Sequence, residues 1–305
     1  MTILERKRNP YESTFPTEIV TCRVNGERRR LRLFIKYGTE RFDRGYGHRG
    51  DVGYEGRVYR DVLSPLPLST PTFYGTYRPR DARMPWLLMD YVNGGIQASH
   101  SRDPNAMVVA SRWIGRFHAI NERRVRDRRL RFLRRYGASY YRAWPRRAER
   151  IFAPWRNRLP WLFRLAGDFG AVMPTLLNAP PTVIHGEYFG LNIIYRKGNC
   201  WPADWQSTAI APGEIDLVSL THSWPDALVR KCQREYLRAR WPQGRPERFD
   251  EILAAARLYV NFRWLGDGAI MVPAAGPSGR PRVPKRAKKF LKDLYAAGTT
   301  LGWIE

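Results

Sequence analysis

The first ninety residues alternate apolar and polar side chains in short runs. Residues 29–37 carry Leu31, Leu33 and Ile35 at every second position, and an apolar run at residues 18–24 precedes them, with Asn25-Gly26 between. Because Asn-Gly accepts the positive φ angles of a tight type I′ turn, this segment predicts a β-hairpin. The next apolar run, at residues 84–92, is closed by glycines and predicts a buried strand.

Helical spacing begins between Asp51 and Leu63, where Tyr54, Val58 and Val62 recur at every fourth position. After Gly95 the pattern is mostly helical. We expect helices at residues 104–120, 122–151, 217–224, 225–240, 248–265 and 285–297, and short strands at residues 182–185, 192–195 and 200–204. The pattern predicts an α+β protein. Its 305 residues exceed one ordinary core, so we expect two lobes, at residues 1–92 and 93–305.

The composition of the chain excludes several classes of protein. Hydrophobic residues make up 43% of the chain, which excludes a disordered protein. No apolar run is long enough to span a membrane, and the first ten residues lack the apolar core of a signal peptide, so we expect a cytoplasmic protein. Three scattered cysteines, Cys22, Cys200 and Cys232, are interpreted as reduced packing residues, and no Cys/His spacing indicates zinc.

The net charge of +25 indicates anionic partners, such as nucleic acid or acidic small molecules. Arginines are densest at residues 122–150, where tyrosines and a tryptophan lie among them. Arginine with aromatic residues is one way to bind single-stranded nucleic acid. Alternatively, a codon usage that favours arginine places these residues on a solvated surface without any specific partner. The charge alone therefore does not identify the partner.

The densest group of polar residues lies between His185 and Leu217. It contains carboxylates at Glu187 and Asp204 and an amide at Asn192. Phosphoryl transfer needs one carboxylate near the acceptor hydroxyl, and an amide oxygen with a second carboxylate to hold Mg²⁺ against the phosphates. Tight turns between the predicted strands allow these groups to converge, so the segment favours a phosphoryl-transfer site.

The same segment resembles the aminoglycoside phosphotransferase and choline kinase family, which is related to the protein kinases. That family has a His-Gly-Asp catalytic loop with Asn after four further residues, then an Ile-Asp-Trp-Glu metal loop, and then Gly-Asp-Pro and Asp-Leu segments. This chain fills those places with His185, Gly186, Asn192, Asp204, Trp205, Gly213, Asp216 and Leu217. The resemblance implies a bilobal protein-kinase-like fold. It also implies Mg²⁺ ligation by Asn192 and Asp204, with Asp216 and His185 supporting the catalytic loop.

The small lobe fits the same resemblance. Lys36 ends the alternating strand, where the family has the lysine that binds the α- and β-phosphates. It is the only lysine between Lys7 and Lys197, which suggests that a compact ammonium group is needed there. The resemblance further implies that Glu55 pairs with Lys36. The backbone of Asp90 and Val92 would bind adenine.

Two features depart from the family pattern. Glu187 replaces the catalytic aspartate and is one methylene longer, so the carboxylate must fold back or the acceptor must lie farther away. No Gly-x-Gly-x-x-Gly motif precedes Lys36, and Ser13 and Thr14 would have to cover the phosphates. Residues 45–50 do match that motif, but no strand directly precedes them. We therefore interpret them as a mobile loop and not as a dinucleotide-binding turn.

Together these features predict an enzyme that transfers the γ-phosphoryl group of ATP or GTP to a hydroxyl of a small molecule, with Mg²⁺ as the metal and Glu187 as the base. The positive charge favours a neutral or anionic acceptor over a polycation, and residues 122–150 are expected to help bind it. Two alternatives stay open: a nucleotide-binding relative with altered chemistry, and an arginine-rich protein that binds nucleic acid. The sequence does not indicate the acceptor or the oligomeric state.

Overall fold

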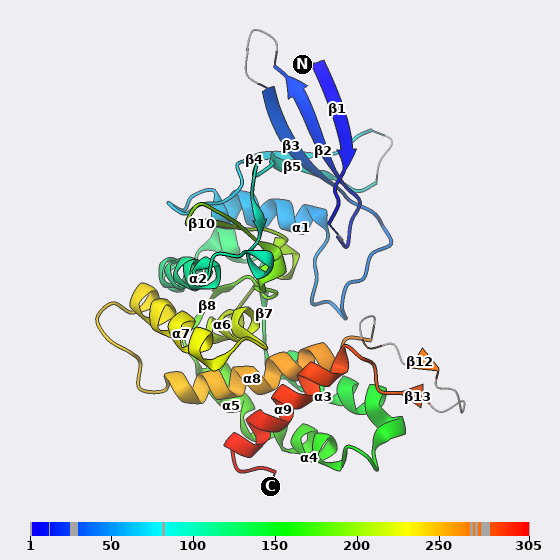
Figure 1. The fold of residues 1–305 in the computed structure, drawn as a ribbon, viewed down its shortest axis with the longest axis vertical. Coiled ribbons are helices and arrows are strands. Elements are labelled where there is room, and N and C mark those ends of the chain that lie inside the picture. The colour runs from blue at the N-terminus through cyan, green and yellow to red at the C-terminus, as the bar shows by residue number, and fades with distance from the viewer. Residues whose placement is uncertain are drawn as a thin grey trace.

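The computed structural model describes residues 2–11, 13–24, 30–80, 83–268, 271, 274–275 and 281–304. The Asn25-Gly26 turn lies outside the described residues. The chain begins with a sheet that stands at the top of the molecule in Figure 1, and the helices lie below it.

The N-terminal sheet has five strands in the order β1-β2-β3-β5-β4. They are β1 (Thr2–Arg8), β2 (Thr17–Arg23), β3 (Arg30–Tyr37), β4 (Phe73–Tyr77) and β5 (Trp86–Asp90). Strands β2 and β3 pair antiparallel, with Val20 opposite Leu33, so the predicted hairpin is confirmed. The sequence analysis missed β1 because every one of its residues is exposed, and an exposed strand carries no apolar alternation.

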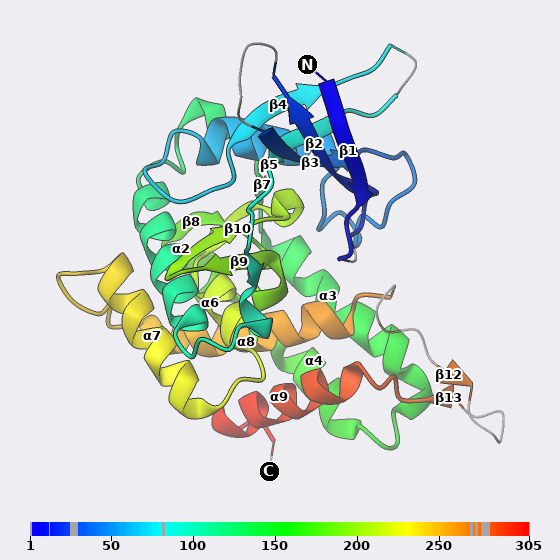
Figure 2. The ribbon, with the colours of Figure 1, turned by 45° about the horizontal axis from the view of Figure 1, so that its top comes forward.

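Helix α1 (Val52–Arg57) packs under this sheet, as Figures 1 and 2 show. The carboxylate of Asp51 caps it by accepting a hydrogen bond from the backbone N–H of Tyr54 at 2.8 Å. The helix continues as a π-helical turn over Val58–Leu63. The helix predicted between Asp51 and Leu63 is therefore confirmed, and its buried face includes the side chain of Glu55.

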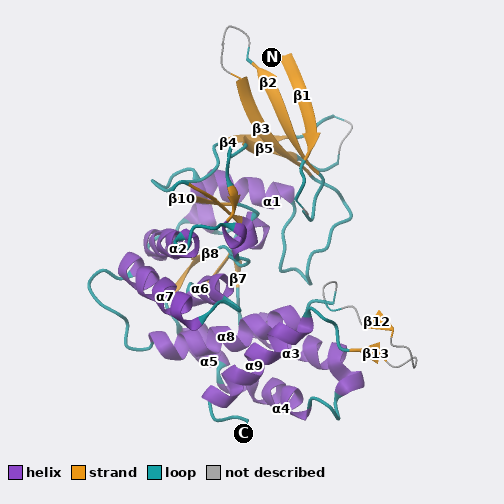
Figure 3. Cartoon of the chain, viewed as in Figure 1, coloured by secondary structure: helices purple, strands orange, loops and turns teal. Residues whose placement is uncertain are grey.

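The rest of the chain is mainly helical, with short strands among the helices (Figure 3). The helices are α2 (Ala106–Glu122), α3 (Ala138–Phe152), α4 (Pro160–Asp168), α5 (Met173–Asn178), α6 (Glu214–Thr221), α7 (Asp226–Arg240), α8 (Phe249–Leu265) and α9 (Ala287–Thr300). The strands are β6 (Ile96–Gln97), β7 (Arg134–Arg135), β8 (Pro181–Ile184), β9 (Ile193–Arg196), β10 (Asn199–Pro202), β11 (Ala209–Pro212), β12 (Ala274–Ala275) and β13 (Pro281–Arg282). The strands predicted near residues 182, 192 and 200 are confirmed. The boundary between the lobes at residue 92 stays a prediction.

The single helical stretch predicted for residues 122–151 is wrong. Helix α2 ends at Glu122 and α3 begins only at Ala138. Between them, Arg134 and Arg135 form strand β7, which pairs parallel with Ala209 and Ile210 of β11. The partner strand lies some seventy residues away in the sequence. The periodicity of residues 122–151 alone therefore cannot predict this pairing.

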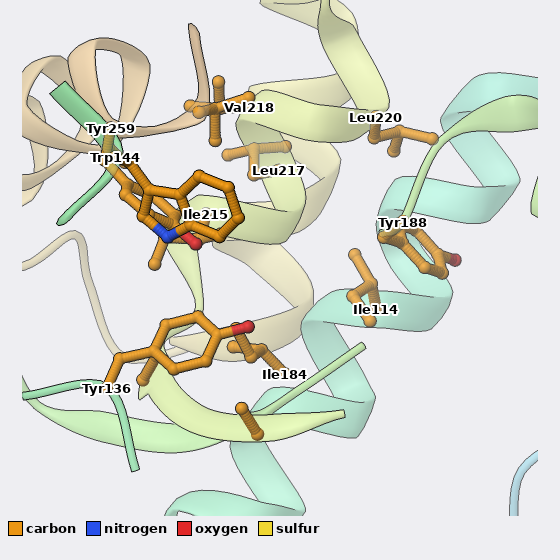
Figure 4. Packing of buried hydrophobic residues seen from close by; sticks show 14 of the residues in the cluster. Ile114, Tyr136, Trp144, Ile184, Tyr188, Ile215, Leu217, Val218, Leu220 and Tyr259 are labelled. Atoms are coloured by element: carbon orange, nitrogen blue, oxygen red, sulfur yellow. The ribbon is translucent and has the colours of Figure 1, made fainter. Parts of the chain in front are cut away.

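The core of the helical lobe surrounds α6, whose Ile215, Leu217, Val218 and Leu220 all point into it (Figure 4). Ile184 at the end of β8 packs in the same cluster, which fixes the strand that leads into the predicted catalytic loop. The three cysteines are free and buried, as predicted. Within the described ranges, no helix has the length and apolar character to cross a membrane.

Candidate active site

Lys36 lies between two carboxylates where the sheet meets the helical lobe. Its Nζ is 2.7 Å from Oε2 of Glu55 on α1 and 2.7 Å from Oδ1 of Asp204, which follows β10. We call these three residues the lysine cluster. The structure thus brings together three residues that the sequence placed in two separate lobes.

Burial and charge oppose each other in the lysine cluster. Burial favours the neutral amine of Lys36, but the charges of Asp204 and Glu55 outweigh it and raise the pKa of Lys36 above its usual value. Burial raises the pKa of Glu55, and Lys36 opposes that shift. Burial also disfavours ionised Asp204, yet Lys36 holds the pKa of Asp204 below its usual value. With both carboxylates ionised, the cluster carries a net negative charge, which suits a metal cation.

Asp204 and Asn192 have the donor atoms that Mg²⁺ prefers. Asp204 occupies the left-handed region at φ 68°, a conformation that is costly for a residue with a Cβ and that persists at functional sites. Lys36 and Gln206 both donate to its Oδ1, which leaves Oδ2 as a ligand atom. The Nδ2 of Asn192 donates to the Glu187 carbonyl at 3.1 Å, so the amide oxygen is left as a second ligand atom. Oxygen donors of this kind fit a hard divalent ion.

The predicted catalytic loop is held by its backbone. The carboxylate of Asp216 accepts hydrogen bonds from the N–H of His185 at 2.6 Å and from the N–H of Gly186 at 2.9 Å. Gly186 has φ 86°, and a Cβ at this position would lie 2.2 Å from the carbonyl oxygen of Ser207, so only glycine fits. The ring Nε2 of His185 lies 3.0 Å from the Ala203 carbonyl, an orienting contact that ties the loop to the segment leading to Asp204.

A cavity of about 140 Å³ extends from Lys36 toward β5. Asp90 and Val92 both line it, and so does Ser13 from the turn between β1 and β2. The N–H of Asp90 already donates to the Thr72 carbonyl at 2.9 Å, so only its carbonyl is left for a base. Thr14 is not among the lining residues, and its hydroxyl instead accepts a hydrogen bond from Gln206 at 3.3 Å.

Glu187 is buried in a second group of charges. Arg49 donates to Glu187 Oε1 from Nη2 at 2.8 Å, and Arg263 of α8 donates to the same oxygen. Arg49 also contacts Asp267 at 3.2 Å. We call Arg49, Glu187, Arg263 and Asp267 the arginine cluster. All four side chains are at least 90% buried, so the cluster is screened from water.

The arginine cluster fixes the charge of Glu187. Burial would raise its pKa, but the charges of Arg263 and Arg49 outweigh burial and hold the pKa at about 2. The neighbouring ring of His48 is 3.6 Å from Glu187. Burial, followed by the charge of Arg263, lowers the pKa of His48 well below its usual value, so the ring is neutral. Glu187 is therefore ionised at neutral pH and is a weak proton acceptor.

Residues 45–50 form a loop ahead of α1, as interpreted, and this loop is packed against the helical lobe. This segment runs from the sheet toward the helical lobe in Figure 1. His48 is fully buried, with Tyr140 of α3 2.7 Å from its Nδ1, and its carbonyl accepts a hydrogen bond from Arg134. The glycines around it permit the positive φ angles of the turn, so this motif shapes a loop that carries Arg49 into the site.

The sequence analysis missed both arginines of this cluster. Arg49 lies inside the glycine motif at residues 45–50, and its position next to His48 gives no sign of a partner 138 residues away. Arg263 lies in a stretch of α8, from Leu258 to Leu265, in which Asn261 is the other polar residue. An arginine in such a stretch is the one signal that could have indicated a buried ion pair.

Solved structures with the same fold include several kinases. Wild-type aminoglycoside 2'-phosphotransferase-IIIa in its GDP complex is similar with a TM-score of 0.66 and 12% identity, over 99% of this chain and 94% of that chain. Choline kinase LicA from Streptococcus pneumoniae gives 0.63 and 13% identity, over 97% and 95%. Spectinomycin phosphotransferase with ADP and spectinomycin gives 0.60 and 11%, over 96% and 89%. These similarities confirm the bilobal, kinase-like α+β fold.

The family follows from a sequence comparison. Residues 41–251 match the model of the phosphotransferase enzyme family. The chain therefore belongs to the phosphotransferase enzyme family, as the resemblance predicted, and it is a phosphotransferase. None of the curated protein sequences matches it.

Proposed function

We propose that the protein transfers the γ-phosphoryl group of ATP or GTP, with Mg²⁺, to a hydroxyl of a small neutral or anionic molecule. The observation that carries this proposal is the lysine cluster at the end of the cavity lined by Asp90 and Val92. A purine would lie against β5, and the phosphates would extend toward Lys36. Nucleotide complexes of similar folds, with GDP and with ADP, support a nucleotide in this place.

Each group of the site has a defined task in this proposal. Lys36, aligned by Glu55, binds the phosphates, and Ser13 covers them. Asn192 and Asp204 would hold Mg²⁺, which neutralises the charge that develops on the phosphates. The acceptor oxygen forms a bond to the γ-phosphorus, and the bond from that phosphorus to the β–γ bridging oxygen breaks. The products are a phosphate ester and a nucleoside diphosphate.

Glu187 remains our proposed acceptor of the hydroxyl proton, which then passes to water. With a pKa of about 2 it takes a proton poorly, so its contribution would be mainly orientation of the acceptor. Phosphoryl transfer tolerates this, because its loose transition state depends on positioning more than on proton removal.

The acceptor is proposed to be neutral or anionic because the chain carries a net charge of +25. The names of similar proteins, by contrast, refer to aminoglycosides and choline, which are cations. The cavities beside the catalytic loop contain none of the arginines of residues 122–150 in their described lining. Arg134 contacts the loop beside the site, through the His48 carbonyl.

The arginine cluster favours one second candidate, a nucleotide-binding relative with altered chemistry. If two buried arginines keep Glu187 from the acceptor, nucleotide binding would persist without transfer. The two candidates differ in turnover and not in nucleotide affinity.

Thermal unfolding with ATP or GTP, with and without Mg²⁺, tests the proposal. A nucleotide at about 100 times its Kd should stabilise the protein by about 2.7 kcal/mol. We expect a shift that needs Mg²⁺ and that Asp204→Ala abolishes, whereas Asp168→Ala, an exposed aspartate at the end of α4, leaves it intact. No shift with either nucleotide would contradict the proposal.

A further inference from the structure

A second cavity, of about 450 Å³, lies beside the catalytic loop. Leu191 lines both this cavity and the nucleotide cavity, so the two meet at the loop that precedes Asn192. The remaining walls come from Ser99, the end of α6 and the residues that follow it, the end of α8 and the start of α9. A molecule bound here would contact the catalytic loop without occupying the nucleotide cavity.

Aromatic side chains form much of the wall. Trp264 of α8 stacks on Phe290 of α9, with ring centroids 5.5 Å apart and planes 16° apart. Phe189 of the catalytic loop meets Trp264 edge to face at 5.7 Å, and Trp224 lines the cavity as well. Stacked and edge-on rings of this kind accept a planar apolar group.

Two cations, Arg286 and Lys289, line the same cavity. The described lining contains no carboxylate. Asp293 pairs with His222, which lines the cavity, at 2.9 Å from its Nε2, and accepts a hydrogen bond from the Ser223 hydroxyl at 3.3 Å. Because the cavity lining supplies two cations and no carboxylate, it favours a ligand that carries one anionic group.

Trp264 also connects this cavity to the arginine cluster. The guanidinium of Arg263 lies 4.3 Å from the centre of the Trp264 ring, and Arg263 itself contacts Glu187. The aromatic wall is thus adjacent to the carboxylate of the catalytic loop.

We propose that this cavity binds the phosphoryl acceptor, and that the acceptor is a small aromatic hydroxyl compound with an acidic group. The ring would pack against Trp264, the acid would bind Arg286 and Lys289, and the hydroxyl would face the catalytic loop. This assignment rests on the proposed function, because it names the acceptor of that reaction.

Three para-substituted benzyl alcohols test the assignment. They are 4-(hydroxymethyl)benzoate, 1,4-benzenedimethanol and 4-(aminomethyl)benzyl alcohol, which share a ring and a hydroxyl and differ in charge. Calorimetry on the nucleotide-free protein should give the tightest binding for the carboxylate, by about tenfold over the neutral diol, the size of one charge-assisted contact. Equal binding of all three, tighter binding of the amine, or no binding would overturn the assignment.

Surface variants locate the binding. Arg286→Gln/Lys289→Gln should weaken the carboxylate about tenfold and leave the diol within about twofold. Lys288→Gln/Lys292→Gln, two exposed lysines of α9 outside the cavity lining, should change neither. Both pairs lie on the surface, so loss of folding does not confuse the result. An unchanged affinity in Arg286→Gln/Lys289→Gln would contradict the placement.

Transfer of labelled phosphate from ATP separates this inference from the proposed function. Charge-selective binding without transfer would keep the cavity assignment as a binding site and contradict the phosphotransfer role of these ligands. Transfer to an acceptor whose KM is unaffected by Arg286→Gln/Lys289→Gln would keep the proposed function and overturn the cavity assignment.

Discussion

Two buried ion clusters lie at the junction of the lobes, and they have opposite compositions. The lysine cluster places one cation between two carboxylates, with Nζ of Lys36 at 2.7 Å from each. The arginine cluster places Glu187 against two guanidinium groups. In the first cluster an excess of negative charge remains, and this charge can attract a metal cation. In the second the charges of Arg49 and Arg263 are balanced by Glu187 and Asp267, so the carboxylate of the catalytic loop is already satisfied.

This difference in composition distinguishes the proposed binding of the magnesium nucleotide from the proposed role of Glu187. The lysine cluster has the composition expected for a magnesium-nucleotide site. The arginine cluster makes Glu187 a firmly ionised group that joins the loop at residues 45–50 to the catalytic loop and to α8. The arginine cluster therefore stabilises the junction of the lobes.

Removing the central charge of the lysine cluster has the largest expected effect. Lys36→Met leaves Glu55 and Asp204 without their cation, and breaking a buried pair in this way costs about 3–5 kcal/mol of the free energy of unfolding. Chemical denaturation measures the loss. Lys36→Met/Glu55→Leu should recover part of it, because both partners are then apolar. The control Lys7→Met removes an exposed lysine, and a Lys36→Met protein as stable as this control would contradict the expectation.

Removing the central charge of the arginine cluster has the next largest effect, and it depends on pH. The folded pKa of Glu187, about 2, lies below the usual 4.5, so its ionisation contributes stability above pH 4.5 that is lost as the pH falls toward 2. That shift corresponds to about 3 kcal/mol. Glu187→Gln should therefore lose about 3 kcal/mol at pH 7, and its difference from the wild type should shrink in acid.

Denaturation curves at several pH values between 7 and 2.5 measure this. Glu247→Gln, an exposed substitution of the same kind, should follow the wild type throughout. A difference between Glu187→Gln and the wild type that stays constant down to pH 2.5 would show that the ionised state of Glu187 is not the cause.

The sequence allowed the lysine cluster to be predicted because each member lies in a recognisable local pattern. Lys36 ends an alternating strand, Glu55 lies on the following helix, and Asp204 precedes a tryptophan after a short strand. The resemblance to a known family supplied their proximity. The fold class and most helices followed from periodicity for the same local reason.

The arginine cluster could not be predicted in this way. It joins three segments, at residues 49, 187 and 263–267, whose proximity is created by packing of the loop on α3 and of α8 against α6. Strand β7 was not predicted for a similar reason, since its partner β11 is far away in the sequence. Long-range contacts of this kind leave no periodic signal in either segment.

Removing one arginine of the arginine cluster should have a smaller effect on stability than removing Glu187. Arg49→Met removes one of the two charges that lower the pKa of Glu187, so this pKa should rise toward 4.5. The free energy of unfolding should fall by about 2 kcal/mol, because Arg263 still pairs with Glu187. Stability as a function of pH measures both, since the acid-dependent loss should begin at a higher pH and be smaller. Arg44→Met, an exposed arginine of the same loop that lies over Phe42, is the matched control and should leave the profile unchanged.

The smallest change tests the extra methylene itself. Glu187→Asp keeps the charge but withdraws the carboxylate by about one bond length, so the hydrogen bonds from Arg49 and Arg263 should lengthen and the stability should fall by about 1 kcal/mol. The carboxylate would then be a better proton acceptor, because weaker contacts with the arginines allow its pKa to rise. With an acceptor in hand, we expect kcat at neutral pH to rise in Glu187→Asp relative to the wild type while the KM for the nucleotide is unchanged. If kcat falls as far as it does in Glu187→Gln, then the longer side chain is itself required, and the contacts with Arg49 and Arg263 serve the reaction instead of restraining it.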